Sequence, residues 1–129
     1  MSELAVQGCK IQITSGQSAK NILVTTKPSS AVLINNKGVY FDSIDVSLKA
    51  VTAGNLLLES GTITINGTAS KVLDENGKKA LQKNDNATKK FSFTDTVSGS
   101  TVSADVTVKI TDAGQSDVIA SWRLFSDEV

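Results

Sequence analysis

The sequence predicts an all-β protein, because of the spacing of its turns, its composition and the alternation of its apolar residues. Turn-forming residues recur from Gly8 to Gly114 at the roughly 8–12-residue spacing typical of a β-sandwich, barrel or prism. Only 5% of the residues are aromatic, so Val, Ile and Leu must fill most of the core, and this mixture favours strands. With 129 residues, the chain is expected to form one domain over 1–129.

Charge and cysteine content exclude several classes of function. The 13 basic and 13 acidic residues cancel, which removes the positive field that drives binding to nucleic acid or anionic membranes, so no nucleic-acid partner is predicted. The single cysteine, Cys9, cannot form an intrachain disulfide, which favours a reducing compartment. The first residues lack a signal-peptide pattern and no apolar stretch approaches ~20 residues, so we expect a soluble protein made in the cytoplasm.

The first half of the chain is predicted to hold short strands separated by turns. The expected strands cover residues 4–14 in two pieces around Gly8, 22–26, 31–34, 39–41 and 44–51. Pro28 should interrupt the sheet because proline cannot donate to a ladder. Asn35-Asn36-Lys37-Gly38 offers residues that tolerate positive φ and predicts a hairpin.

The second half repeats this pattern. Asn66-Gly67 predicts a hairpin, with residues 62–65 entering and 68–73 returning. Asp74-Glu75-Asn76-Gly77 predicts a turn, and the lysine-rich residues 78–86 could form a short helix or a loop. Residues 91–110 alternate with period two around Ser98-Gly99-Ser100, as in a β-meander. Residues 118–125 concentrate the tryptophan with large apolar residues and suggest a final strand or a docking tail.

The residue types also restrict the chemistry. No histidine is present, which removes the usual general base, the Ser-His-Asp triad and the commonest zinc ligand. Cys9 has no activating partner and is interpreted as a small buried apolar residue. Two carboxylate pairs are the remaining enzymatic option, Asp42 with Asp45 and Asp74 with Glu75, but they flank predicted turns, where acidic residues commonly cap the chain. We therefore expect no enzyme, no catalytic or metal site and no cofactor, with a carboxylate-dependent hydrolase as the least favoured hypothesis.

Charge is unevenly distributed between two segments. Residues 71–90 hold six lysines and three acids, whereas residues 91–129 hold two basic and six acidic residues. A solvated surface is the preferred interpretation, and complementary contact between subunits is the alternative.

One segment carries a family resemblance. Residues 61–72 read Gly-Thr-Ile-Thr-Ile-Asn-Gly-Thr-Ala-Ser-Lys-Val, which resembles the repeat of PAAR proteins, with Thr68-Ala69-Ser70-Lys71 one residue closer to the turn than the family's Pro-Ala-Ala-Arg run. Residues 30–38 repeat the strand and asparagine-led turn. The opening, Glu-Leu-Ala-Val-Gln-Gly-Cys over residues 3–9, also looks like the start of PAAR-like chains. The resemblance covers residues 3–85 and leaves 91–129 as an added β module or docking tail.

The resemblance implies a tapered, β-prism-like domain with hairpin repeats that caps the trimeric, VgrG-like spike of a contractile injection machine, in a phage-tail-like particle or a type VI secretion system. Such a tip aids membrane puncture and can carry effector or toxin cargo. It would leave the cytoplasm within the injection particle, to the outside or into a target cell, and would touch the target membrane only on puncture. Leu4, Val6 and Ile11 would have structural roles.

Two points qualify this resemblance. Family members typically hold zinc through histidines and a cysteine, and this chain has no histidine to supply, so no metal is expected. The alternative is an Ig-like β-sandwich that acts as a binding module of a phage tail, baseplate or adhesion assembly.

Overall fold

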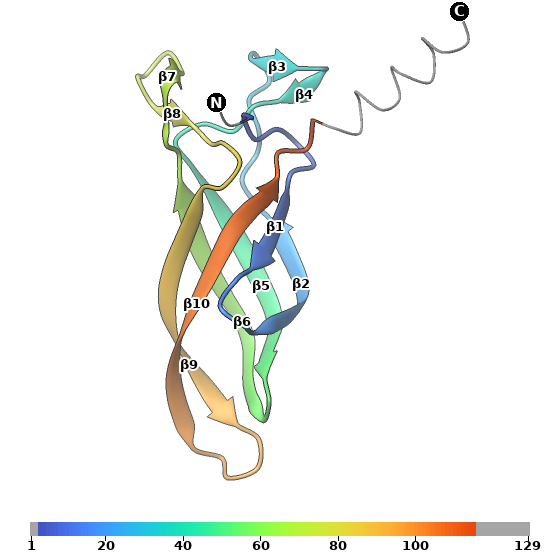
Figure 1. Cartoon of the computed structure of the whole chain (residues 1–129), viewed down its shortest axis with the longest axis vertical. Coiled ribbons are helices and arrows are strands. Elements are labelled where there is room, and N and C mark those ends of the chain that lie inside the picture. Colours follow the sequence, from blue (N-terminus) through green and yellow to red (C-terminus); the bar gives the residue numbers. More distant parts are fainter. Residues whose placement is uncertain (1–2, 116–129) are drawn as a thin grey trace, which may run out of the picture.

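The computed structural model describes residues 3–115, and every regular element within them is a β-strand (Figure 1). The strands are β1 (Lys10–Ile13), β2 (Ser18–Val24), β3 (Leu33–Ile34), β4 (Lys37–Gly38), β5 (Ser43–Ala53), β6 (Leu56–Asn66), β7 (Ala69–Leu73), β8 (Lys79–Ala80), β9 (Asn86–Asp95) and β10 (Thr101–Asp112). The all-β expectation is confirmed. The final strand or docking tail predicted at 118–125 lies outside the described residues.

Six strands form one antiparallel sheet that curls into a nearly closed barrel. Their order is β1-β10-β9-β6-β5-β2, so β1 and β2 are the two edges. The sheet consists of two three-stranded halves, and the halves are joined only by the pairs Leu56–Asp95 and Leu57–Thr94. The sandwich alternative expected two separate packed sheets, whereas this sheet is continuous through that junction.

Strand β5 shows how the sequence pattern produces the inner face of the barrel. Ile44, Val46 and Leu48 are buried, and Asp45 between them is exposed, because successive side chains in a strand point to opposite faces. The alternation shifts by one residue at Ala50, whose φ is 52°, and Val51 is then buried.

Five of the six strands contribute buried side chains to the core of the barrel, and β2 contributes the partly buried Ala19, Ile22 and Val24. The buried members of this cluster are Ala5, Ile11, Tyr40, Ile44, Val46, Leu48, Val51, Ile63, Ile65, Leu81, Phe93, Val106, Val108 and Ile110. Aliphatic side chains dominate this set, as the composition predicted.

One end of the barrel carries the two small sheets, and we call it the wide end (Figure 1). Here β3 pairs with β4, and β7 pairs with β8. The β3–β4 turn holds Asn35 and Asn36 at φ values of 53° and 67°, which confirms the predicted hairpin. A second, smaller cluster of Val6, Val39, Ala69 and Ala80 packs beneath these sheets.

The opposite, narrow end is formed by residues 50–58 and 91–104, at the β5–β6 and β9–β10 turns (Figure 1). The two turns are tied together, because the backbone N–H and the hydroxyl of Thr96 each donate to the carbonyl of Asn55 at 2.9 Å. Pairing of Phe91–Ala104 and Phe93–Val102 confirms the predicted β9–β10 meander.

Two local predictions in the second half are corrected. Asn66-Gly67 does not form a hairpin: β6 pairs along its length with β5, and β7 pairs with β8. Gly67 instead allows the backbone of β8 to pack closely against it, because a Cβ at this position would lie 2.4 Å from the carbonyl oxygen of Lys79. The short helix considered for residues 78–86 is also absent, since this stretch holds β8, a bridge at Gln82 and a turn.

Asp85 is the buried charged residue of the described chain, with 6% of its surface exposed. Its carboxylate accepts hydrogen bonds from the Thr68 hydroxyl and from the Gln82 N–H, the latter at 2.9 Å. Its own carbonyl accepts from Ile110 N–H at 2.9 Å. One side chain thus joins the segment after β6 to the entry of β9, beside β10.

Replacing Gly67 with Ala should destabilise the protein by about 1–3 kcal/mol, because the added methyl group displaces the β8 backbone. Chemical denaturation would measure this loss. Ser70→Ala, on exposed strand surface, is the control and should change stability by less than about 0.5 kcal/mol. Equal effects of the two substitutions would contradict the close approach of β8.

Replacing Asp85 with Ala should lower the free energy of unfolding by about 1–3 kcal/mol, since it leaves the Gln82 N–H and the Thr68 hydroxyl without their acceptor. Urea titration monitored by circular dichroism would detect the change. Asp105→Ala removes an exposed carboxylate from β10 and should be nearly neutral. A neutral Asp85→Ala variant would refute the structural role of this carboxylate.

Candidate functional site

Of the four acidic residues singled out in the sequence, Asp42, Asp45 and Asp74 accept hydrogen bonds in the structure. Asp45 is exposed on β5 and accepts a hydrogen bond from the Thr64 hydroxyl at 2.7 Å. Asp42 is exposed with φ of 69°, and its carbonyl accepts from Gly67 N–H. Among residues 3–115 no three His, Cys, Asp or Glu side chains gather into a group that could hold a metal ion.

Asp74 shapes the β7–β8 turn. Its carboxylate accepts from the backbone N–H groups of Asn76 and Lys78 at 2.8 and 2.9 Å, which is the side-chain turn chemistry that places Asp at such positions. Gly77 completes the turn at φ of 77°. The predicted turn at 74–77 is therefore confirmed.

A groove at the wide end is the first surface with binding potential. It has a volume of about 380 Å³, and its lining comes from the segment before β3, from Phe41 and from the β7–β8 turn. Val32 and Leu73 line it with 42% and 50% of their surface exposed, and Leu33, which follows Val32 in the chain, is 50% exposed. Exposed apolar side chains gathered around a groove can bind the apolar side chains of a partner.

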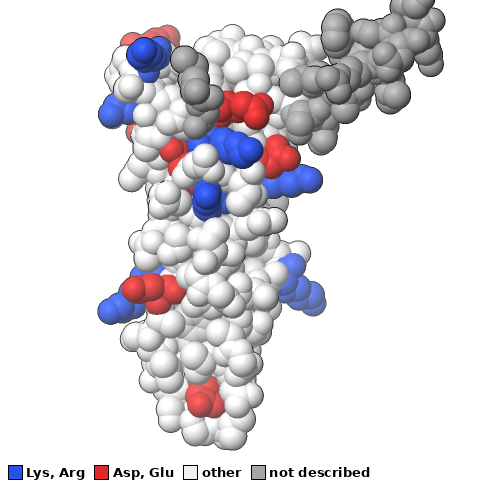
Figure 2. All heavy atoms as spheres, viewed as in Figure 1, with Lys and Arg blue, Asp and Glu red and all other residues white. Residues whose placement is uncertain are grey.

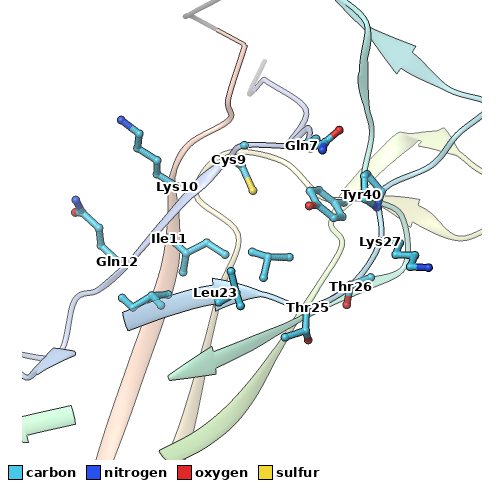
Figure 3. A pocket seen from close by; sticks show the side chains of 14 residues that line it. Gln7, Cys9, Lys10, Ile11, Gln12, Leu23, Thr25, Thr26, Lys27 and Tyr40 are labelled. Carbon is cyan, nitrogen blue, oxygen red and sulfur yellow. The ribbon is translucent and has the colours of Figure 1, made fainter. Parts of the chain in front are cut away.

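The opening between the edge strands β1 and β2 is a larger cavity, and we call it the seam. Its volume is about 650 Å³ and both strands line it (Figure 3). In this view Cys9 and Ile11 point into the cavity near the ring of Tyr40, whereas Lys10 and Gln12 point away from it (Figure 3). The alternation of β1 therefore gives the seam an apolar floor.

Cys9 is partly buried at the seam. Burial raises the pKa of the Cys9 thiol to about 11, and the negative charge of Asp112 adds to the rise. Burial also raises the pKa of Tyr40 above its usual value, with Cys9 as the second cause. Because the thiolate is the reactive form of cysteine, the site disfavours nucleophilic chemistry at Cys9. These surroundings support its interpretation as an apolar filler.

The narrow end has a different surface. Residues 50–58 and 91–104 include one charged residue, Asp95, and Val97 at the β9–β10 turn is 77% exposed. Asp95 accepts from the N–H groups of Val97 and Ser98 at 2.9 and 3.3 Å, and these hydrogen bonds hold its pKa below the usual value. On the face shown in Figure 2, the lower part of the molecule is narrow and nearly free of charged side chains.

The groove and the seam were both missed by sequence reasoning. Leu33 and Leu73 occur in apolar runs that the sequence assigns to strands, but these strands are short pieces at one end of the molecule. Whether such residues are exposed depends on which other elements cover them in the folded protein. The alternation of apolar residues along the sequence does not indicate this. Comparison with known proteins adds no assignment, because no family model, no curated protein and no solved structure matches this chain.

Native Cys9 should react slowly with iodoacetamide. A pKa near 11, compared with about 9 for an exposed thiol, lowers the thiolate fraction at pH 8 about a hundredfold. The reaction rate in buffer should therefore fall about two orders of magnitude below the rate in guanidinium chloride, where the chain is unfolded. Similar rates in both solutions would show that the thiol is exposed and unperturbed.

Proposed function

We propose that this protein is a non-enzymatic tip that caps the trimeric, VgrG-like spike of a contractile injection machine, as the PAAR resemblance implies. The proposal includes a tapered, PAAR-type domain, which the same resemblance implies. Support comes from the shape and surface of the molecule more than from Asn66-Gly67, because that dipeptide does not form the hairpin on which the resemblance partly relied.

The observation that carries the proposal is the difference between the two ends. A cap needs a broad base that binds the spike and a slender opposite end that meets the target membrane. The wide end has two small sheets, a groove lined by the exposed Val32 and Leu73, and the exposed Leu33 on β3. The narrow end consists of two tied turns, and the long axis of the molecule connects the two ends (Figure 1).

The composition of the narrow end supports contact with a membrane during puncture. Moving a charged side chain into hydrocarbon is costly, and this end carries a single carboxylate in 23 residues, nine in 50–58 and fourteen in 91–104. Its strands instead expose Thr, Ser and Val side chains. In the described part of the chain no helix is long and apolar enough to span a bilayer.

Within residues 3–115, β1 and β2 are the edge strands of the sheet, and this favours a second candidate, the lateral binding module of a tail, baseplate or adhesion assembly. Edge strands present unpaired backbone groups that can add a strand from another chain. In that case the partner would contact the side of the barrel near Leu23, which is 63% exposed. The two candidates therefore use different surfaces.

Co-purification with candidate trimeric spike proteins, followed by light scattering of the complex, tests the proposal. One copy of this protein per spike trimer is expected, because a single cap sits on the three-fold axis. Three copies per trimer, or no binding to any spike, would overturn the tip function and favour the lateral module.

Substitutions at the two surfaces should separate the candidates. Replacing Leu33 and Leu73 together with Asp should weaken spike binding at least tenfold, about 1.4 kcal/mol, because two apolar contacts are lost at the base. Leu23→Asp on β2 is similarly exposed and serves as the control, with unchanged affinity. Isothermal titration would measure the affinities. Unchanged binding by the Leu33 and Leu73 variant, together with weaker binding by Leu23→Asp, would favour an interface on the side of the barrel.

A further inference from the structure

The seam is bordered by β1 and β2, which are the edge strands of the sheet within residues 3–115 and run in opposite directions. Thr14 N–H donates to the Thr107 carbonyl at 2.9 Å, and Thr25 N–H donates to the Asp45 carbonyl at 2.9 Å. Alternate residues of an antiparallel strand point their N–H and C=O groups to the opposite edge. The residues that direct these groups into the seam are therefore Ile11, Ile22 and Val24.

The opening between these borders is shaped for an extended polypeptide. Two facing rows of backbone donors and acceptors can each form a ladder of hydrogen bonds with an added strand. The lining of the seam comes from residues 7–12 on one side and 22–28 on the other, together with Tyr40. These borders match about six residues of an extended chain, roughly 20 Å in length.

The floor of the seam selects the inward side chains of such a strand. Cys9 and Ile11 point into the cavity near the ring of Tyr40 (Figure 3), and the partly buried Ile22 and Val24 line it from β2. Successive side chains of a strand point to opposite faces. Apolar side chains at every second position of the added strand would therefore be removed from water against this floor.

The rim of the seam is positively charged. Lys10 and Lys27 are exposed, and none of the described residues that line the seam is acidic. Lys10 begins β1 and Lys27 follows β2, so the two lysines border the same end of the seam. Asp112 lies opposite Lys10 on β10, where its carboxylate accepts a hydrogen bond from Gly114 N–H at 2.8 Å. Carboxylates on the outward face of an added strand would lie beside the two lysines, where they are favoured.

The same edges of a second copy do not supply this charge. Residues 4–41 contain four lysines and no acidic residue. Pairing β1 with β1, or β2 with β2, would bring lysines next to lysines, and like charges on neighbouring strands oppose pairing. The complementary strand therefore belongs to a partner that carries carboxylates.

We propose that the seam binds an extended segment of a partner protein, about six residues long, in which apolar and acidic side chains alternate. Its backbone pairs with Ile22 and Val24, its apolar side chains face Tyr40, and its carboxylates lie beside Lys10 and Lys27. This site gives the lateral candidate a partner of defined chemistry. It does not rest on the spike cap, because peptide binding is measured without any spike protein.

A labelled peptide of alternating Val and Glu, about six residues long, tests the proposal by fluorescence anisotropy with the full chain. This peptide should bind. A peptide of alternating Val and Lys should bind at least about tenfold more weakly, because its ammonium groups face Lys10 and Lys27. Proline at a central position of the Val–Glu peptide should also weaken binding, since it removes a backbone donor. No binding of the Val–Glu peptide, or equal binding of the Val–Lys peptide, would overturn the proposal.

Reversing the charge of the rim should reverse this preference. The double variant Lys10→Glu, Lys27→Glu should bind the Val–Lys peptide more tightly than the Val–Glu peptide. The control, Lys49→Glu with Lys71→Glu, changes the net charge equally at exposed positions outside the seam and should keep the preference for Val–Glu. Equal effects of the two double variants would show that net charge governs binding and would rule out the rim as its site.

Amide hydrogen exchange locates the bound peptide and shows whether the seam is free. The amides of Ile22 and Val24 should exchange rapidly in the unbound protein and slowly with the Val–Glu peptide, while those of Ile44 and Ile63 in the core stay protected in both. Slow exchange at Ile22 and Val24 without peptide would mean that the seam is already filled, which contradicts the proposal. Light scattering would then distinguish a second copy from the chain itself as the occupant.

Discussion

The described structure depends on one constraint: its six-stranded sheet has a single apolar face, and it buries that face by closing on itself. Ile44, Ile63, Phe93 and Val106 come from four strands and meet in one cluster. Among the described residues no helix or second large sheet covers this cluster. The sheet therefore curls until its two edges approach each other, and the position of those edges decides where the side of the protein is open.

The same closure explains the surface features of the molecule. The halves of the sheet are joined by two residue pairs at the narrow end. The two turns that are tied together there carry one charged residue, Asp95. At the wide end the barrel is covered by short hairpins that cannot bury Val32, Leu33 and Leu73. Asp85 adds to the β7–β8 pairing there, since its carboxylate accepts hydrogen bonds from Thr68, which precedes β7, and from Gln82, which follows β8.

The candidate surfaces were less predictable than the fold. The absence of histidine from the sequence excluded histidine-based catalysis and histidine metal ligands. The turn roles expected for acidic residues agree with the hydrogen bonds of Asp74. Nothing in the spacing of Leu33 and Leu73, forty residues apart, indicated that both would be exposed at one end. Cys9 was expected to be an apolar filler, and only its neighbours in space explain why its thiol is hard to ionise.

The sequence by itself determined the strands and most turns of this protein, because period-two alternation and the φ preferences of Asn, Gly and Pro act over a few residues. It also determined that metal and triad chemistry based on histidine is not available. Only the tertiary structure decided which strands pair and where the barrel stays open. Asn66-Gly67 shows the physical reason. Its local preference for a hairpin is overridden by the pairing of β6 with β5 and by the packing of the β8 backbone against Gly67. Such contacts join residues far apart in the sequence, so a short sequence window does not indicate them.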